Sequence, residues 1–262
     1  MSRVIKDDTK NRNSFGSLSS DYDKVRRGYP DSVFSYLIKR SRHLDGVRTL
    51  DLGCGTGIST RELHVHGFDA VGIDKEEKMV SLARSKHDKI RYEVGSAKKL
   101  PFPEGSFDVV TAFTSFHWFD DATSVENIIR VLKPEGLLFT VLKLTSEKSH
   151  KGRKCQRDYW RMLNKYGVYS ANDPAVNHRP YLVLRRHGFT ETEKRHFYAY
   201  ERYTVKEAVG LSKTLSSWNL IPEERRHEYL KEVEALYGRN LTAGKLVRRR
   251  EFTVVSGFNP GL

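Results

Sequence analysis

Strand-like and helix-like segments alternate along the first 145 residues of this chain. Short runs of apolar and β-branched residues are each followed by a segment with apolar side chains at helical spacing. The predicted strands are 47–53, 69–74, 90–96, 107–113 and 137–144, and the predicted helices are 32–44, 58–67, 75–86 and 122–133. Because a helix between two strands returns the chain in the same direction, this order predicts an α/β fold with a doubly wound, Rossmann-like, mostly parallel sheet.

The glycine-rich stretch "LDLGCGTG" follows the first predicted strand and leads into a helix. Its glycines permit a tight turn and a close approach of a ligand to the backbone; they are Gly53, Gly55 and Gly57. A phosphate-binding P-loop needs a lysine that "GTGIST" lacks, and a dinucleotide fingerprint needs a small residue where Ile58 stands. With Asp51 just before the glycines, the pattern favours a ligand that carries a cationic amino group and no pyrophosphate.

Asp74 ends the second predicted strand, nineteen residues after Gly55. A carboxylate at this place can accept hydrogen bonds from both hydroxyls of a ribose, as an adenosine-bearing cofactor requires. The alternative is a structural role, because Asp is also favoured as the N-cap of the helix that follows.

The stretch "FTSFHWFDD" (113–121) crowds three aromatic side chains and a histidine into four consecutive positions, 116–119, just after the fourth predicted strand. Ligands of open α/β sheets bind at the carboxyl ends of the strands, so this stretch is a candidate wall of the site. Packing in the core is the alternative, and we assign Phe116 and Phe119 to it.

The positive charge is concentrated in the second half of the chain. Residues 1–145 hold 23 Lys and Arg against 20 Asp and Glu, whereas residues 146–262 hold 23 against 13. Three interpretations of this basic region stay open. It is a surface that binds nucleic acid, the entrance of a binding site that attracts a small anionic substrate, or a solvated basic surface without a partner.

The cysteines and the N-terminus predict a protein of the cytoplasm. Cys54 and Cys155 are too few and too far apart for a disulfide framework or a metal-ligand cluster. The N-terminal twenty residues contain no apolar run of a signal peptide, and no later run has the length of a membrane span. We therefore expect no metal and no membrane, and a mobile segment at 1–20.

The C-terminal part is less regular. Amphipathic helices are predicted at 155–167 and 222–238, strands at 194–205 and 250–258, and a helix with a loop at 204–218.

Four motifs resemble, in order and spacing, those of the class I S-adenosylmethionine-dependent methyltransferases: "LDLGCGTG", "GID", "GSAKKLPFPEGSFDVV" and "LKPEGLL". The resemblance spans roughly residues 15–145. "YDKVRRGYP" (22–30) together with "FHWF" is similar to the small-molecule branch, methyltransferase type 11, which includes the trans-aconitate methyltransferases. The malonyl-carrier-protein methyltransferases have a similar pattern.

The resemblance implies a set of cofactor-binding positions: Tyr22, Arg26, Asp51, Gly53, Gly55, Asp74, Lys75, Ser96, Ala97, Phe113 and Thr114. Asp51 would lie near the amino group of the cofactor, the glycines along its methionine part, and Asp74 at the ribose. Ser96 and Ala97 would border the adenine, although the family usually has Asp where Ser96 stands.

Two residues of the N-terminal motif, Tyr22 and Arg26, would cover the cofactor and pair with its carboxylate. The family often has proline where Arg27 stands. The alternative for Arg26 is a surface cation on a helix.

On the acceptor side, the resemblance assigns His117 and Trp118 to the site, and Trp218 is a further candidate for substrate contact, with core packing as its alternative. Phe113 and Thr114 would flank the cofactor through their backbone. An ionised carboxylate acceptor needs no general base, whereas a phenol, alcohol or amine does, and His117 is then the predicted base.

The family pattern also implies a domain organisation. A core at 21–145 would bind the cofactor, and 146–262 would supply lid helices and an antiparallel edge pair that completes a seven-stranded sheet. The expected activity is transfer of a methyl group from S-adenosylmethionine to a small molecule, a carboxylic acid among the candidates, with S-adenosylhomocysteine as product. An RNA or protein methyltransferase and a non-catalytic cofactor-binding protein are the alternatives. We expect a monomer.

Overall fold

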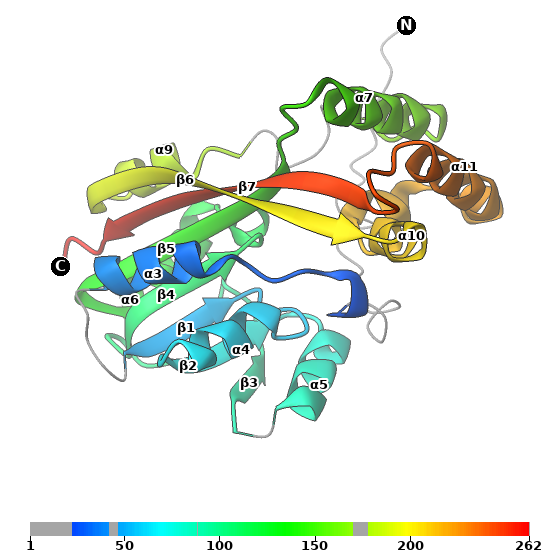
Figure 1. Ribbon diagram of the computed structural model, residues 1–262. Coiled ribbons are helices and arrows are strands. Elements are labelled where there is room, and N and C mark those ends of the chain that lie inside the picture. The colour runs from blue at the N-terminus through cyan, green and yellow to red at the C-terminus, as the bar shows by residue number, and fades with distance from the viewer. Residues whose placement is uncertain (1–22, 42–46, 88, 170–177, 262) are drawn as a thin grey trace, which may run out of the picture. The chain divides into compact units, whose positions relative to one another are not determined.

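The computed structural model describes residues 23–41, 47–87, 89–169 and 178–261 (Figure 1). Their contacts group them into two compact units. The sheet unit comprises the described residues of 27–146, 178–199 and 249–261, and the helical unit those of 23–26, 147–169 and 200–248. Tyr22 and the segment 1–20 lie outside the described residues.

Seven strands form one sheet in the order β3-β2-β1-β4-β5-β7-β6. Their bounds are β1 Arg48–Leu52, β2 Asp69–Asp74, β3 Arg91–Val94, β4 Phe107–Phe113, β5 Leu132–Thr145, β6 Thr190–Tyr203 and β7 Leu246–Phe258. The pairs β1–β2, β1–β4, β2–β3 and β4–β5 are parallel, and β7 is antiparallel to β5. The predicted fold class, a mostly parallel Rossmann-like sheet of seven strands with an antiparallel edge, is therefore confirmed.

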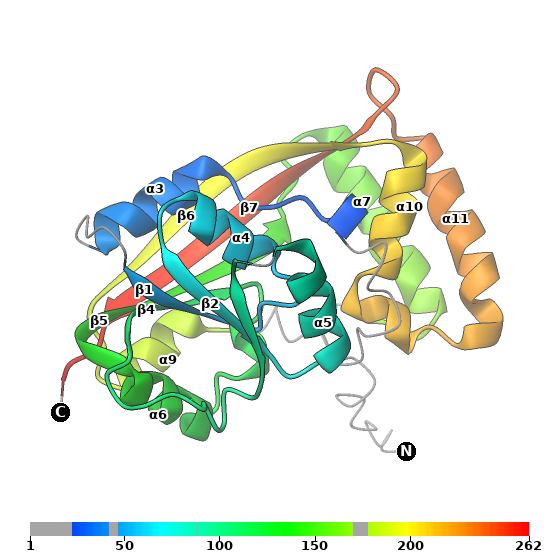
Figure 2. The same cartoon turned by 90° about the horizontal axis from the view of Figure 1, so that it is seen from below.

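Helices cover both faces of the sheet (Figures 1 and 2). On one face, α3 (Asp31–Arg40) and α4 (Ile58–Val65) bury Phe34 and Leu63 against strand residues such as Phe139. On the other face, α6 (Ala122–Val131) and α9 (Pro180–Arg186) bury Ile128 and Leu184. Strand side chains alternate between these two cores, as a sheet covered on both faces requires. Helix α5 (Glu77–Lys86) packs on Tyr92 of β3.

Helix α6 and strand β5 meet earlier than predicted. The helix ends at Val131, and the strand begins at Leu132, so that Pro134 and Gly136 lie inside β5. The strand begins early because Leu132 pairs with Phe107 of β4. The side chain of Asn259 also contacts this turn, since its Nδ2 lies 3.1–3.4 Å from three carbonyl oxygens of residues 129, 132 and 133. This long-range contact holds the turn in a way that no local signal indicates.

The helical unit has a core rich in tyrosine. Helices α7 (His150–Lys165), α10 (Val205–Lys213) and α11 (Arg226–Gly238) bury Tyr159 and Tyr229, whose hydroxyl oxygens lie 3.1 Å apart. Thr204 begins α10 with a capping box, in which its hydroxyl accepts from the amide of Glu207 and the Glu207 carboxylate accepts from the amide of Thr204.

No helix in the described part of the chain is long and apolar enough to cross a membrane. Within the same residues, no group of three or more histidine, cysteine, aspartate or glutamate side chains is arranged to hold a metal ion.

Glu62 of α4 makes the stability of the sheet unit depend on pH. Its carboxylate accepts from the amide of Tyr29 at 3.2 Å, and burial raises the pKa of Glu62 to about 7. The folded chain thus holds a proton that the unfolded chain releases near pH 4.5, so this group lowers the free energy of unfolding as pH rises from about 4.5 to 7.

We expect Glu62→Gln to flatten that decrease, because the amide oxygen still accepts from Tyr29 and nothing ionises. Urea unfolding at pH 4.5, 6 and 8 measures it. Glu126→Gln, which replaces an exposed carboxylate on α6, is the control. Parallel pH profiles of Glu62→Gln and wild type would contradict the expectation.

Candidate active site at the carboxyl ends of the parallel strands

The glycine loop between β1 and α4 takes a left-handed backbone at every second residue. The φ angles of Gly53, Gly55 and Gly57 are 67°, 54° and 77°. Residues with a Cβ adopt this region at a cost, so the predicted need for glycine is confirmed at these three positions.

The three glycines differ in what surrounds them. A Cβ on Gly53 would lie 2.6 Å from Cβ of Ser115, and a Cβ on Gly57 would lie 2.6 Å from the hydroxyl oxygen of Tyr92. A Cβ on Gly55 would meet no atom within 4 Å. Gly53 and Gly57 are therefore required by packing inside the protein, whereas the backbone at Gly55 borders open space.

Asp74 connects the second strand to this loop. One carboxylate oxygen accepts from the amide of Gly55 at 2.9 Å, and the other accepts from the amide of Glu76 at 2.9 Å. The N-cap of α5 is Glu76 rather than Asp74. Asp74 is half-buried, so its carboxylate shapes the loop and still borders solvent. Lys75 is exposed, with its Nζ 3.9 Å from Oε1 of Glu76.

Asp51, the last polar residue of β1, is fully buried. One of its oxygens accepts from the hydroxyls of Ser59 and Thr60 at 2.7 Å, and the other accepts from Thr111 at 3.0 Å. Burial raises the pKa of Asp51 to about 6, and the three hydroxyl donors limit the rise because they stabilise the carboxylate. This side chain ties β1 to α4 and β4.

At the end of β4 the backbone turns sharply. Thr114 has a φ of 56°, its amide donates to the carbonyl of Val141, and its hydroxyl lies 2.9 Å from that of Tyr29. The ring of Tyr29 also contacts Phe113, at 4.7 Å between centroids. Tyr29 therefore lies at the end of β4, within the candidate site. It belongs to the "YDKVRRGYP" motif, but the sequence alone gave it no role.

The next residue, Ser115, donates its hydroxyl to the carbonyl of Leu52 at 2.6 Å and so holds this turn against the glycine loop. Phe116 is buried in the core under α6, which confirms its assignment to packing. Phe119 is partly buried and packs on the same core.

His117 and Trp118 belong to a short 3-10 helix, Phe116–Trp118, and their rings lie 4.8 Å apart. Burial lowers the pKa of His117 to about 4; the neighbouring His178 adds to the shift and Asp120 opposes it. His117 is therefore a neutral imidazole at physiological pH, able to accept a hydrogen bond or a proton.

Sequence reasoning missed His178. Its Nδ1 lies 2.8 Å from a carboxylate oxygen of Asp120, and its ring lies 6.0 Å from that of His117. The sequence shows no signal for this pairing, because 58 residues separate the two partners.

The remaining candidates lie at different places. Ser96 is exposed after β3, with its hydroxyl 3.3 Å from the amide of Lys98, and Ala97 is half-buried. Arg26 belongs to the helical unit and donates to the carbonyl oxygen of Thr214 at 2.7 Å. Trp218 belongs to the same unit, where its ring packs 6.1 Å from that of Tyr229.

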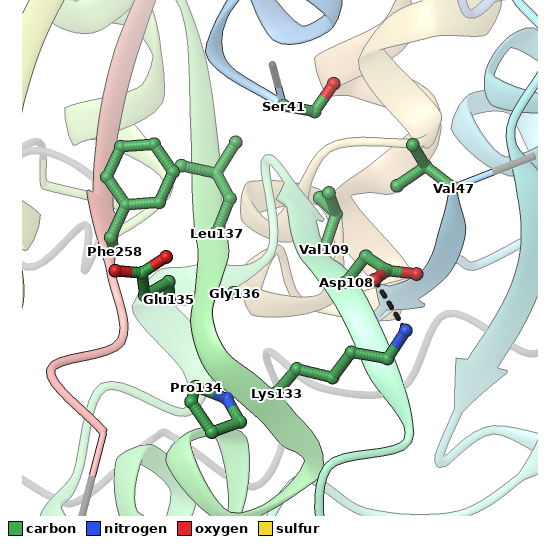
Figure 3. A pocket seen from close by; sticks show the side chains of 10 residues that line it. All are labelled: Ser41, Val47, Asp108, Val109, Lys133, Pro134, Glu135, Gly136, Leu137 and Phe258. Atoms are coloured by element: carbon green, nitrogen blue, oxygen red, sulfur yellow. Dashed lines mark hydrogen bonds and ion pairs between the residues drawn. The ribbon is translucent and has the colours of Figure 1, made fainter. Parts of the chain in front are cut away.

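A pocket of about 170 Å³ opens at the other end of the strands (Figure 3). Val47 and Val109 line it, and Lys133 forms an ion pair with Asp108 at its edge, at 2.6 Å. These residues precede or begin β1, β4 and β5, so the pocket lies at the amino ends of the strands. It is separate from the glycine loop and holds none of the predicted site residues.

Comparison with known proteins gives a consistent result. Residues 50–140 match the family model described as "Methyltransferase domain". An uncharacterised methyltransferase of Schizosaccharomyces pombe is 25% identical over 226 residues, which cover 85% of this chain and 86% of that protein. An uncharacterised methyltransferase of Mycobacterium tuberculosis is 32% identical over 135 residues, 52% of this chain; the match spans about half, 54%, of that relative.

Among solved structures, a protein of Anaeromyxobacter dehalogenans assigned provisionally as a type II methyltransferase superposes with a TM-score of 0.68. It is 22% identical, and the match covers 90% of this chain and 99% of that one. At this identity the likeness is one of fold.

The different surroundings of the glycines generate a test of stability. Gly55→Ala should cost about 1–2 kcal/mol of unfolding free energy, the strain of a left-handed backbone alone. Gly57→Ala should cost more, because its Cβ also displaces the buried ring of Tyr92. Urea unfolding of both variants and of wild type measures the two free energies. Equal losses of unfolding free energy would show that the ring of Tyr92 moves aside without cost.

Proposed function

This chain is a methyltransferase, and from that premise we propose that it transfers the methyl group of S-adenosylmethionine to a small-molecule acceptor. The observation that carries the proposal is the arrangement of Gly55 and Asp74. A half-buried carboxylate is held beside a loop backbone that borders open space, and such a carboxylate can accept from the two hydroxyls of a ribose.

In this proposal the cofactor lies along the carboxyl ends of β1, β2 and β4. Gly53 and Gly55 face its methionine part, Asp74 its ribose, and Ser96 and Ala97 its adenine. Lys75 and the turn at Phe113 and Thr114 border it, and the roles of Tyr22 and Arg26 at its carboxylate stay predictions from the sequence.

Asp51 acts through the loop. Since three hydroxyls occupy its oxygens, its proposed role toward the amino group of the cofactor is to shape the glycine loop and to supply negative potential. This is a positioning role, and the amino group itself would bind to backbone carbonyls of the loop.

The sulfonium of S-adenosylmethionine supplies the activated methyl group when it is bound. The chain's own contribution is to align the acceptor with that methyl group and to exclude water, which can lower the barrier by several kcal/mol. His117, neutral and largely buried, is the proposed base toward a phenol, alcohol or amine, and Trp118 a wall of the acceptor site. Trp218 stays a prediction from the sequence for acceptor contact.

A small acceptor is favoured over a polymer because the residues next to His117 are aromatic and buried or half-buried, and none of them is basic. Binding of unrelated RNA that weakens steeply with salt would instead support a polymer substrate.

Asp74→Asn tests the cofactor site. The carboxamide can keep one loop contact but loses the charge, so we expect affinity for S-adenosylmethionine to fall by about 1–3 kcal/mol, roughly 5- to 150-fold. Isothermal titration calorimetry measures it, with Glu126→Gln as the control. Unchanged affinity would limit Asp74 to a structural role, and no binding to wild type would refute the proposed cofactor.

His117→Gln tests the base. Turnover should fall while affinity for S-adenosylmethionine stays within about twofold, because the side chain acts on the acceptor. In wild type, protonation of His117 should lower kcat/KM only as the pH approaches 4. A loss of cofactor affinity equal to the loss of turnover would place His117 at the cofactor instead.

A further inference from the structure

His178 is a buried imidazole beside the proposed acceptor site. It lies two residues before the start of α9 in the sheet unit, and its ring lies 5.4 Å from that of Phe116 and 6.0 Å from that of His117. Its side chain is 2% exposed. The proposed base, His117, thus has a second histidine against it that comes from a distant part of the chain.

Asp120 determines which nitrogen of His178 carries the hydrogen. The Asp120 carboxylate can only accept, so Nδ1 of His178, at 2.8 Å, is the donor. In the neutral ring the other nitrogen, Nε2, then holds an unshared electron pair. The pair resembles a carboxylate that orients an imidazole for use at its far nitrogen.

Nε2 of His178 is buried and has no hydrogen-bond partner in the part of the chain that the structure describes. A buried polar atom without a partner costs about 1–3 kcal/mol, so it needs a compensating role. A phenylalanine would fill the same space against Phe116 without that cost. Packing alone therefore does not account for a histidine held by a carboxylate.

The charges around this imidazole are few. Asp120 binds Nδ1, His117 is neutral because its pKa is lowered to about 4, and Arg179 donates to the backbone carbonyl of His178. These side chains are not arranged as a metal site within the described residues.

We propose that His178, oriented by Asp120, is a second catalytic histidine whose Nε2 accepts the hydrogen of a hydroxyl or amine on the methyl acceptor. This inference rests on the proposed function and names its substrate class. A carboxylate acceptor carries no hydrogen and would place a lone pair against that of Nε2.

A lone pair on the acceptor oxygen or nitrogen forms the bond to the methyl carbon, and the electrons of the methyl–sulfur bond remain on sulfur. The acceptor's proton moves to Nε2, and Asp120 stabilises the imidazolium through Nδ1–H. The products are the methylated acceptor and S-adenosylhomocysteine. In this inference His178 takes the proton in place of His117, and the neutral ring of His117 contacts the acceptor as a hydrogen-bond acceptor.

The first test needs no substrate. Long-range ¹H–¹⁵N spectra of the full chain with labelled histidine report which ring nitrogen is protonated, and His178→Gln assigns the signals. We expect Nδ1 of His178 to be protonated and Nε2 unprotonated at pH 7.5. In Asp120→Asn the carboxamide can donate to Nδ1, so the protonated form of Nε2 should increase. A protonated Nε2 in wild type would overturn the proposal.

The second test uses phenol as the probe. Anisole, which lacks the hydroxyl hydrogen, is the matched control, and S-adenosylhomocysteine is present in both titrations. Phenol should shift the Nε2 signal saturably and anisole should not. Equal responses, or no response to phenol, would overturn the proposal.

Calorimetry separates this inference from the proposed function. His178→Gln should bind S-adenosylmethionine within about twofold of wild type, as should His227→Gln, an exposed control on α11. If wild type binds the cofactor and phenol does not shift the Nε2 signal of His178, only the present inference fails. If wild type binds no cofactor, the proposed function fails, and the proposed role of His178 fails with it.

Discussion

The buried carboxylate of Asp51 is the contact on which the site depends. Burying a charged carboxylate away from water costs free energy, and for this reason the pKa of Asp51 is raised to about 6. Three hydroxyl donors, from Ser59, Thr60 and Thr111, compensate it. Because these donors come from α4 and β4, the interaction fixes the start of a helix and the end of a neighbouring strand relative to β1. The glycine loop connects β1 to this helix, so both of its ends are held in place.

A second set of contacts completes the edge of the sheet. Asp74 holds the amide of Gly55, Ser115 holds the carbonyl of Leu52, and Gly53 leaves room for Ser115. Each uses a polar group or a missing Cβ to bring two strand ends together. The result is a loop whose backbone at Gly55 borders open space, whereas a Cβ on Gly53 or Gly57 would meet neighbouring side chains.

Local patterns were sufficient for most of the fold. Alternating apolar runs predicted the first five strands, and the order of elements predicted a parallel sheet, which the structure confirms. They failed where a distant contact determines an element. The early start of β5 depends on the pairing of Leu132 with Phe107, and α9 was not predicted at all, since it is short and its burial comes from Leu184 against the sheet.

The sequence by itself determined the order of strands and helices, the glycine positions and the carboxylates that follow the strands, because these depend on periodicity, backbone conformation and spacing along the chain. Only the tertiary structure decided what those groups do to one another. In the folded chain, hydroxyl groups donate to the carboxylate of Asp51, and the backbone at Gly55 borders open space. His178 contacts Asp120 and lies near His117. The physical reason is that burial and hydrogen-bond partners are properties of neighbours in space, and here those neighbours lie up to about 60 residues apart in the chain.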